Sequence, residues 1–414
     1  MEVYQILFLV AIFLGLYTAI FSLLTIYERW GNHKTRVART NLPSVCVVIP
    51  CFNEEQTLAR TLDSVLALDY PKDLLEVVVV DDGSSDNTLQ VAKSYKSKGV
   101  IVYAKKNGGK HTALNYALKR TKAEIVGALD ADSTVAKNAL RKIVWYFRDQ
   151  DVMAVTPSMK IDSPKGLLRR IQSVEFVIGV LLRRVFADLG SQHVTPGPFT
   201  MYRMSFFEKH GLYRKAHMTE DIEVALRIQS KHYLIENATD AYVYTHGPGS
   251  WRGLYKQRIR WYYGFLSNIL DYRHLFSREH GNLGLFILPM SFLSIGVLAT
   301  IASYTLGRMI YNTAQNIYFY WLIGFDWRTM FELNLELFFL NTNIVSILGV
   351  AAFLGGLSVM LTARYFAQEK GLFLSYILFL LCYSWLYVFW WLAAFYHKIF
   401  NKKMSWGHKS KVGR

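Results

Sequence analysis

The feature that most constrains the fold is an uncharged, strongly apolar segment at residues 4–27, which reads YQILFLVAIFLGLYTAIFSLLTIY. As a helix it is long enough to cross a hydrocarbon core of roughly 30 Å. It lacks the basic flank and the small-residue cleavage site of a signal peptide, so we expect residues 1–30 to form a retained N-terminal transmembrane helix. The segment is followed by basic residues, among them Lys34, Arg36 and Arg39. Because cytoplasmic flanks are rich in lysine and arginine, this pattern places the next domain in the cytoplasm and the protein in the cell membrane.

The chain changes character between residues 43 and 250, where short β-branched runs such as SVCVVIP and LEVVVVDD alternate with helical stretches. This alternation predicts an α/β domain with a mainly parallel sheet covered on both faces. Ligands of such sheets bind beyond the carboxyl ends of the strands. Asp81 and Asp82 end one predicted strand, and Asp130 and Asp132 end another. We therefore expect both acidic pairs to project into the same crevice.

The two acidic pairs predict a metal site. Close carboxylates repel one another unless a cation or a hydrogen-bond donor lies between them. Mg²⁺ and Mn²⁺ take one or two protein carboxylates and fill their remaining positions with phosphate oxygens and water. The expected ligand is therefore a metal-bound diphosphate. A solvated turn would explain either pair alone, but the repetition of the pair in one fold favours the metal.

The net charge of +16 allows several kinds of partner. It fits a nucleic acid, the anionic surface of a bilayer, or a phosphate-rich substrate. The apolar segments favour the last two, so no nucleic-acid partner is expected. His111, His193 and His246 show no metal-ligand spacing and are expected to have no chemical role.

Two amphipathic helices are predicted next to the catalytic crevice, at residues 165–189 and 251–275. Each has an apolar stripe at helical spacing and a basic polar face, as do helices that lie on a membrane. A buried core helix is the alternative for the first. In the second, Gln257, Arg260 and Trp261 are spaced i, i+3 and i+4 and share one face. An aromatic ring beside an arginine suits a sugar diphosphate, because the ring stacks on the sugar and the guanidinium binds phosphate oxygens.

The C-terminal region, residues 284–397, contains clear apolar spans near 284–307, 337–361 and 372–396. The stretch 316–335 is also apolar, but it is interrupted by Asp326, Arg328 and Glu332. Three spans after a cytoplasmic domain would place the tail outside, whereas the tail at 398–414 is strongly basic and should stay inside. Either 316–335 inserts as a fourth span, or one apolar segment lies in the interface, or the tail is external. We favour a cytoplasmic tail.

Six motifs together resemble a known family. They are VVIPCFNEE, VVVVDDGSSD, NGGKHTALNYAL, LDADS, MTEDIEVALRIQ and KQRIRWYYG, in that order along residues 43–275. The set is similar to that of the processive family 2 glycosyltransferases, which include cellulose, chitin, hyaluronan and poly-N-acetylglucosamine synthases. The resemblance implies a GT-A-like cytoplasmic domain at 43–250 attached to transmembrane and interfacial helices.

The resemblance also implies a donor site. Residues that match the family's uridine-binding positions are Asn53, Glu54, Asp81 and Asp82. Lys110 is expected near the nucleotide. Asp130 and Asp132 match the D-x-D motif, in which Asp132 is the more direct ligand of Mg²⁺ or Mn²⁺.

For transfer, the resemblance assigns a catalytic motif and an acceptor motif. Thr219, Glu220 and Asp221 form the T-E-D motif, in which Asp221 matches the general base. By itself this motif is better explained as a helix N-cap followed by acidic first-turn residues, and only the order of the motifs favours catalysis. The Q-x-x-R-W motif, which holds the diphosphate and the acceptor sugar in the family, covers Gln257, Arg258, Arg260 and Trp261.

Three classes of function follow from these observations. The first is a processive, inverting synthase that extends a β-linked polysaccharide and secretes it through its own helices. The second is a membrane-anchored enzyme that adds a single sugar to a lipid-linked acceptor. The third, a non-catalytic scaffold, would be expected to lose the carboxylates that are present here. We favour the first, with UDP-N-acetylglucosamine as donor, a growing polysaccharide as acceptor and the bilayer as partner; glucose, alternating glucuronate and N-acetylglucosamine, and a small membrane accessory subunit remain open.

Overall fold

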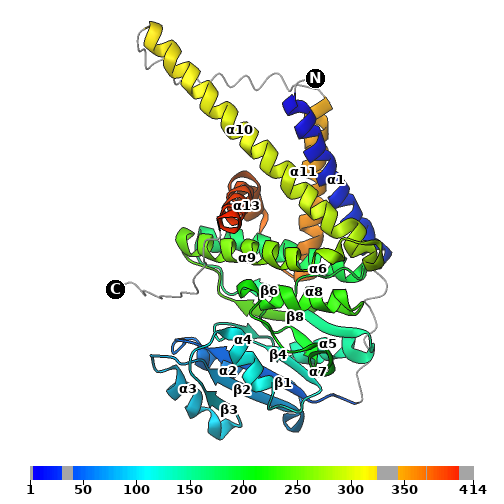
Figure 1. The fold of residues 1–414 in the computed structure, drawn as a ribbon, viewed down its shortest axis with the longest axis vertical. Coiled ribbons are helices and arrows are strands. Elements are labelled where there is room, and N and C mark those ends of the chain that lie inside the picture. The colour runs from blue at the N-terminus through cyan, green and yellow to red at the C-terminus, as the bar shows by residue number, and fades with distance from the viewer. Residues whose placement is uncertain (1–2, 30–40, 324–343, 370, 401–414) are drawn as a thin grey trace.

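The computed structural model describes residues 3–29, 41–323, 344–369 and 371–400. It consists of an α/β part built on one sheet and a set of long helices that project away from it (Figure 1). Between the two parts, α6 (Leu167–Asp188) and α9 (Trp251–Asp271) run across the molecule. These two helices therefore separate the sheet from the projecting helices.

The sheet has eight strands in the order β3-β2-β1-β4-β7-β6-β8-β5. Their bounds are β1 Val45–Cys51, β2 Leu75–Asp81, β3 Ile101–Ala104, β4 Ile125–Ala128, β5 Thr134–Val135, β6 Val152–Ile161, β7 Met201–Arg203 and β8 Leu234–Thr245. Strands β3, β2, β1 and β4 are parallel, and so are β6 and β8. β7 is antiparallel to β4 and to the first residues of β6. The predicted α/β sheet is confirmed, and its parallel half carries the ends of β1, β2 and β4.

Both faces of the sheet are buried, because successive side chains of a strand point to opposite faces. Val45, Val47 and Ile49 pack on the face covered by α2 (Leu58–Leu66), α3 (Thr88–Ser94) and α5 (Ala139–Val144). Cys46 and Val48 pack on the face covered by α4 (Lys110–Leu118), α7 (Met204–His210) and α8 (Glu220–Ser230). Burial of each of these valine or isoleucine side chains contributes about 1.5–3 kcal/mol. The result is a rigid platform for the loops at the strand ends.

Helix α6 is buried more fully than an interfacial helix would be. Its apolar stripe, including Ile171, Val174, Leu181 and Val185, packs in one cluster with residues from α1, α9 and the C-terminal helices. Its opposite side lies on β6 and β8, where Arg184 forms a buried ion pair with Asp188. The amphipathic helix predicted at 165–189 therefore lies between the sheet and the projecting helices.

Among the described residues, three helices are long and apolar enough to cross a membrane: Gln5–Glu28, Leu283–Leu322 and Ile344–Ala367. They correspond to α1 (Val3–Glu28), to a π-helical turn at Leu283–Ile287 with α10 (Leu288–Ile323), and to α11 (Ile344–Ala367). The second is one continuous helix of roughly 60 Å, about twice the thickness of a hydrocarbon core. This helix contains the span predicted at 284–307 and the beginning of the segment 316–335. The rest of that segment lies outside the described residues, as do residues 337–343.

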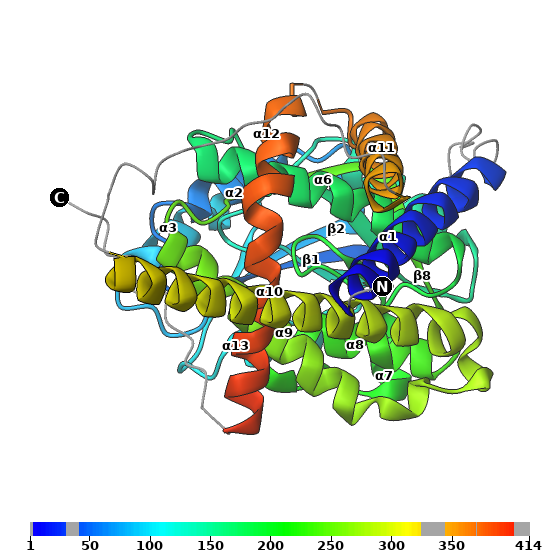
Figure 2. The same ribbon diagram turned by 90° about the horizontal axis from the view of Figure 1, so that it is seen from above.

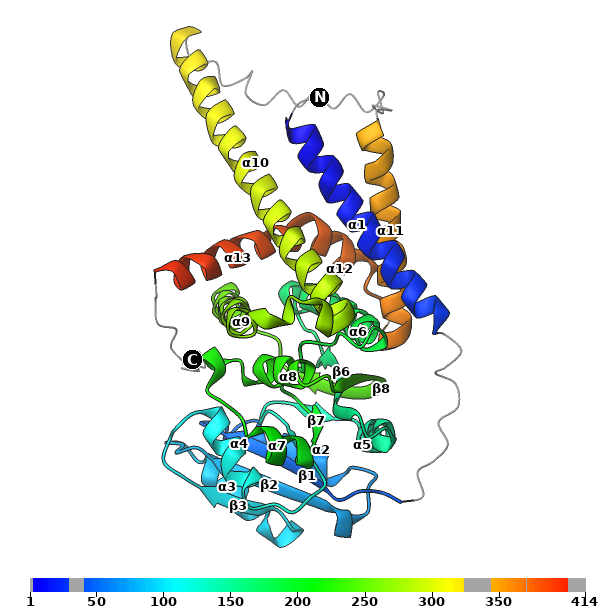
Figure 3. The ribbon, with the colours of Figure 1, turned by 45° about the vertical axis from the view of Figure 1, so that its right-hand side comes forward.

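The apolar segment at 372–396 is not a straight span. Helix α12 (Phe373–Leu378), a π-helical turn at Phe379–Tyr383 and α13 (Ser384–Ile399) form a pair bent by 49°. α12 packs on α6 and places Tyr376 against Gly356 of α11, while α13 lies across α9 (Figure 3). Seen from above, α13 also crosses α10 (Figure 2). Aromatic packing holds it there, since the Tyr262 ring of α9 lies 4.5 Å from the Trp391 ring of α13. Most of the predicted tail at 398–414, namely residues 401–414, lies outside the described residues.

Candidate active site

The ends of β1 and β2 bring the predicted nucleotide-binding residues together. Cys51 and Asp81 are paired in the parallel register, so Asn53 lies opposite the loop that follows β2. Its side-chain Oδ1 accepts a hydrogen bond from the Ser85 amide at 2.8 Å, and its own amide donates to Ser84 Oγ at 2.9 Å. Asn53 has φ 57°, a left-handed conformation that asparagine tolerates better than most residues. It therefore shapes the loop that surrounds the predicted uridine position.

The adjacent acidic residues have different environments. Glu54 accepts a hydrogen bond from Thr57 Oγ1 at 2.7 Å, which orients it at the start of α2. Asp81 is buried, and its Oδ1 has no hydrogen-bond partner among the residues that the structure describes. An unsatisfied buried oxygen is costly, so this atom is suited to accept a hydrogen bond from a bound ligand.

Asp82 holds the loop that leads to α4. Its carboxylate accepts hydrogen bonds from Lys105 Nζ at 2.5 Å, from the Gly108 amide at 3.0 Å and from the Gly109 amide at 2.7 Å. The next residue is Lys110, the first of α4. The structure thus shows that Asp82 positions the start of α4 and Lys110, and its contact with the uridine stays a prediction.

Lys110 connects the D-x-D and T-E-D motifs, which are far apart in the sequence. Its Nζ lies 2.6 Å from Asp130 Oδ1 and 3.4 Å from Glu220 Oε1. Burial by itself would lower the pKa of Lys110, but Asp130, Glu220 and Asp221 outweigh it and raise the pKa above its usual value. Lys110 is therefore a permanent cation between D-x-D and T-E-D.

The D-x-D pair is suited to a divalent cation. Burial and the neighbouring Asp130 raise the pKa of Asp132, and a hydrogen bond from Ser133 Oγ at 3.0 Å opposes the rise. A cation would remove the repulsion that raises this pKa. Within the described residues no group of three histidine, cysteine or acidic side chains is placed to hold a metal. Two carboxylates that depend on ligand oxygens for the other positions fit Mg²⁺ or Mn²⁺.

Asp221 lies in the first turn of α8. Its Oδ1 accepts a hydrogen bond from the Ile222 amide at 2.9 Å. Burial and the adjacent Glu220 raise the pKa of Asp221 to about 6, while Lys110, the Ile222 amide and Arg260 act in the opposite direction. A carboxylate with such a pKa is ionised at neutral pH and yet basic enough to accept a proton.

A glycine in the 195–199 loop lies where these groups converge. A side-chain carbon at Gly197 would be 3.1 Å from Lys110 Nζ, 3.9 Å from Asp130 Oδ2 and 4.0 Å from Asp221 Oδ2. A hydrogen bond attaches this loop to α8, because Thr195 Oγ1 donates to the Asp221 carbonyl oxygen at 2.6 Å. No local sequence pattern indicates that this glycine would lie between the two motifs.

Thr219, predicted as part of the catalytic motif, joins that motif to α9. Its Oγ1 accepts a hydrogen bond from Asn268 Nδ2 at 2.8 Å. At Gly264 the two elements are so close that a side-chain carbon would lie 2.3 Å from Thr219 Oγ1. The helix that carries the Q-x-x-R-W motif therefore packs directly on T-E-D.

The residues of the Q-x-x-R-W motif have two different environments. Arg260 is close enough to Asp221 to lower its pKa. Arg258, which was predicted to bind the diphosphate or the acceptor, is fully buried against α6 and pairs with Glu175 at 2.6 Å. Its guanidinium also lies 4.2 Å from the Trp261 ring and donates to Gln257 Oε1 at 2.8 Å. Arg258 and Trp261 are spaced i and i+3 and are neighbours on the helix surface, so Arg258 supports the Trp261 ring while it pairs with Glu175 of α6.

His246 was expected to have no chemical role, but it lies beside the D-x-D motif. Its Nδ1 is 2.9 Å from the carbonyl oxygen of Asp132. His193 is buried against Phe186 and Phe265, as expected of a structural histidine. The signal that distinguishes the two is the position of His246 directly after β8, whose partner β5 follows Asp132.

Comparison with known proteins agrees with this arrangement. Residues 46–211 match the family model described as glycosyl transferase family 2. Poly-β-1,6-N-acetyl-D-glucosamine synthases of Staphylococcus aureus and Staphylococcus epidermidis are 29% identical over 273 residues, covering 64% of this chain. The chain thereby spans 66% of the length of each of these relatives.

One solved structure shares the fold over nearly the whole chain. It is the mannosyltransferase PcManGT from Pyrobaculum calidifontis in complex with GDP-Man and Mn²⁺, with a TM-score of 0.58 and 19% identity. The match covers 97% of this chain and 100% of that one. The GT-A-like fold expected from the motifs is therefore confirmed. Residues 46–211 are thus similar to glycosyl transferase family 2, whose model they match.

Proposed function

We propose that the chain transfers N-acetylglucosamine repeatedly from UDP-N-acetylglucosamine to a growing β-linked polysaccharide. The observation that carries the proposal is the convergence of Lys110, Asp130 and Asp221 around Gly197. These groups bring a candidate metal-binding carboxylate, a cation and a candidate base together in one place. The staphylococcal relatives, named as synthases of such a polymer, support the choice of sugar.

The donor would bind across the ends of β1, β2 and β4. Asp81 and Asn53 lie where the uridine is expected, and Asp130 and Asp132 would hold Mg²⁺ or Mn²⁺ against the diphosphate. When bound, such a cation stabilises the charge that develops on the departing diphosphate oxygens. Lys110 and Arg260 add positive charge on the protein side of the same group.

Transfer would proceed by direct displacement. The acceptor hydroxyl oxygen forms a bond to the anomeric carbon, and its proton passes to a carboxylate oxygen of Asp221. The bond between the anomeric carbon and the diphosphate oxygen breaks, and UDP leaves with the electron pair. Attack from the side opposite the leaving group inverts the anomeric centre, so an α-linked donor yields a β-linked product.

Processive extension would depend on α9. Trp261 is half-buried and is supported from behind by Arg258, so its ring is held in one orientation. An aromatic surface of this kind can hold the terminal sugar of the acceptor between additions. Because α9 packs on Thr219 at Gly264, the acceptor surface and the base are joined rigidly.

We further propose that the α/β part is cytoplasmic and that the C-terminal tail begins on the same side. α1, α10 and α11 project together from one face of the domain (Figure 1), and α12–α13 lies across α9. Three spans preceded by an external N-terminus return the chain to the domain side. Lys398, near the end of α13, donates to Ser267 Oγ of α9 at 3.1 Å. The interfacial alternative for one apolar segment thus agrees with the basic tail and the positive-inside rule.

A single-transfer enzyme is the second candidate, and one observation favours it. The mannosyltransferase shares the fold over its whole length. The long helices therefore do not by themselves indicate a polymerase, and the distinction must come from the product.

Purified protein in nanodiscs, incubated with Mn²⁺ and a panel of labelled UDP-sugars, would test the function. We expect UDP release and a long polymer with UDP-N-acetylglucosamine, and little of either with UDP-glucose or UDP-glucuronate. A product extended by one sugar would establish the second candidate. The absence of turnover with every nucleotide sugar would refute both.

A further inference from the structure

A cavity of about 1130 Å³ lies outside the site described above. Its walls are the 214–218 loop, the face of α8 that carries Glu223 and Arg227, and the C-terminal end of α9 with the residues that lead to α10. None of the residues that converge at Gly197 lines it. The transfer chemistry therefore does not account for this cavity.

The lining is unusually rich in histidine and basic side chains. Of the 11 histidines in the chain, five line this cavity, namely His210, His217, His232, His274 and His280. The basic side chains are Arg214, Lys215, Arg227 and Lys231, and the acidic ones are Glu223, Asp271 and Glu279.

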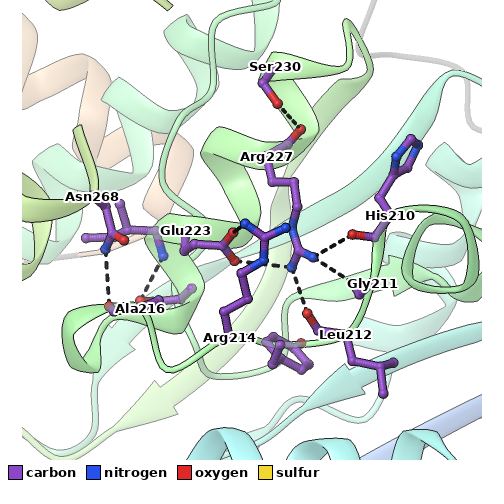
Figure 4. Close-up of polar contacts among 12 residues, drawn as sticks. His210, Gly211, Leu212, Arg214, Ala216, Glu223, Arg227, Ser230 and Asn268 are labelled. Carbon is purple, nitrogen blue, oxygen red and sulfur yellow. Dashed lines mark hydrogen bonds and ion pairs between the residues drawn. The ribbon is translucent and has the colours of Figure 1, made fainter. Parts of the chain in front are cut away.

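The principal acidic side chains are already compensated inside the protein. Glu223 is buried and accepts hydrogen bonds from Arg227 Nη2 at 3.1 Å and from the Tyr272 hydroxyl at 2.6 Å. Figure 4 shows Arg227 between Glu223 and the carbonyls of the 210–212 loop, to which it also donates. Asp271 lies 2.9 Å from His217 Nε2. The charge that remains in the cavity is therefore basic.

Three histidines form a cluster that favours an anion. The rings of His232 and His280 are stacked, with centroids 4.8 Å apart and an interplanar angle of 11°, and His274 lies 6.0 Å from His280. Burial and these two neighbours lower the pKa of His280. His280 Nδ1 and His210 Nε2 are buried without a hydrogen-bond partner among the described residues. Oxygen atoms of an anion would satisfy both nitrogens and allow the imidazoles to take up protons.

Phosphate is the anion that this lining fits best. Lysine, arginine and imidazolium groups together are typical of phosphate sites, and the volume admits more than a single phosphate group. His280 precedes the candidate span at Leu283–Leu322, so the cavity lies where the chain would enter the bilayer. A lipid headgroup and a soluble phosphate compound can both reach such a position.

The cavity is connected to the catalytic motif through its loop. Ala216, His217 and Met218 have φ values of 41°, 50° and 70°, an uncommon left-handed run for residues other than glycine. The next residue is Thr219. Asn268 of α9 donates to the Ala216 carbonyl at 3.3 Å, which anchors the loop to the acceptor helix. A ligand that contacts this loop would alter the position of T-E-D relative to α9.

We propose that this cavity binds a phosphate-bearing anion and that its occupation regulates transfer by fixing the 214–218 loop. The binding does not depend on the enzymatic activity. The regulation rests on the proposed function.

Binding is tested with the full chain in phosphatidylcholine nanodiscs, without divalent metal, by titrating inorganic tripolyphosphate in a calorimeter. The cavity variant carries Lys231→Glu and His232→Asn, two exposed positions, and asparagine tolerates the φ of 58° at His232. The control is Lys119→Glu, which makes the same lysine charge reversal at an exposed position that does not line the cavity. We expect the cavity variant to weaken binding about tenfold and the control about twofold or less. Equal affinities for the two variants, or no binding by the unmodified chain in any lipid, would overturn the proposal.

The source of the phosphate is tested by repeating the titration in nanodiscs that contain phosphatidylglycerol. Loss of the tripolyphosphate signal there would assign the cavity to a lipid headgroup, whereas an unchanged affinity would assign it to a soluble anion.

Regulation is tested by UDP release at a fixed free Mn²⁺ concentration, with and without the anion. We expect a change in kcat that the cavity variant lacks. Unchanged kcat with the anion bound would refute regulation alone, and an absence of turnover would refute the proposed function while leaving the binding result intact.

Discussion

Arg258 Nη2 and Glu175 Oε2 are 2.6 Å apart, although 83 residues separate them in the sequence. The pair joins α9 to α6, and the Tyr383 hydroxyl at the π-helical turn donates to the same Glu175 oxygen at 2.9 Å. The fully buried guanidinium also contacts Gln257 and Trp261. One buried ion pair therefore fixes the acceptor helix relative to two other helices.

Replacing Glu175 by glutamine should destabilise this region. It leaves the buried Arg258 without its carboxylate, and loss of one partner of a buried pair costs about 3–5 kcal/mol. We expect a lower Tm in nanodiscs and a shorter polymer, because Trp261 loses the guanidinium support that holds its ring against the acceptor.

The matched control for this prediction is the double variant Glu175→Gln with Arg258→Met. Removing both charges while keeping the volume should restore most of the Tm, since replacement of a buried pair by apolar groups is often neutral. If the single and double variants had the same Tm, the pair would have no role in stability.

Gly264→Ala should separate α9 from the catalytic motif. The added carbon would lie 2.3 Å from Thr219 Oγ1, so either α9 or the T-E-D motif must shift. We expect UDP release to fall by about tenfold or more, which corresponds to roughly 1.4 kcal/mol of transition-state stabilisation. Gly296→Ala in α10 is the control, because nothing lies within 4 Å of its added carbon. Similar activity of the two alanine variants would show that the contact at Thr219 is unimportant.

Asp221→Asn should abolish transfer and yet preserve UDP binding. It removes the proton acceptor but not the donor-binding carboxylates. In the unmodified protein, burial and Glu220 raise the pKa of Asp221 to about 6, so kcat/KM should rise with pH and reach half its plateau near that value. An active asparagine variant would exclude Asp221 as the base.

The same substitution should increase stability at neutral pH. A folded-state pKa above the unfolded value means that the folded protein binds the proton more tightly, so ionisation of Asp221 weakens folding as pH rises from about 4 to 6. Asparagine removes this penalty, and we expect on the order of 1–2 kcal/mol of added stability at pH 7.5 and little change at pH 4. Tm measurements at both pH values would detect the difference.

Asp132→Asn should weaken metal-dependent binding of UDP. Calorimetry with Mn²⁺ should show at least about a tenfold loss, while UDP binding without metal stays unchanged. Asp162→Asn, an acidic position that pairs with Arg60, is the control. If Asp132→Asn bound UDP and Mn²⁺ normally, the D-x-D pair would have only a structural role.

Part of the site could be predicted from the sequence because it depends on local pattern. Parallel strands end at one edge, so Asp81 and Asp130 had to lie near each other once the strands were recognised. The helical spacing of Gln257, Arg260 and Trp261 likewise fixed their common face. Arg258 was grouped with these residues as a ligand-binding side chain, whereas in the structure it is fully buried and pairs with Glu175.

Other features depend on contacts that no local pattern contains. His246 reaches Asp132 across 114 residues, and Gly197 matters only because three side chains from other elements converge on it. The bend at 379–383 arises where Tyr383 bonds to Glu175 and the aromatic side chains of α13 pack on α9. Hydropathy alone predicted a straight span there, because it measures composition and not the surface on which a helix rests.

The last prediction concerns Trp261 and distinguishes polymerisation from single transfer. If its ring holds the terminal sugar, Trp261→Ala removes about 0.5–1.5 kcal/mol or more of acceptor binding. The substitution should lower the rate of transfer to the acceptor but not the affinity for the nucleotide sugar, because Asp130, Asp132 and Arg260 remain to activate the donor. UDP release should therefore persist, as hydrolysis, while long product disappears.

Trp261→Phe, which keeps a ring on Arg258, controls for loss of packing and should retain polymer of intermediate length. A coupled assay for UDP and a gel for product size, run on the same sample, provide both measurements. Full-length polymer made at the normal rate by Trp261→Ala would reduce α9 to a membrane anchor and favour the single-transfer enzyme.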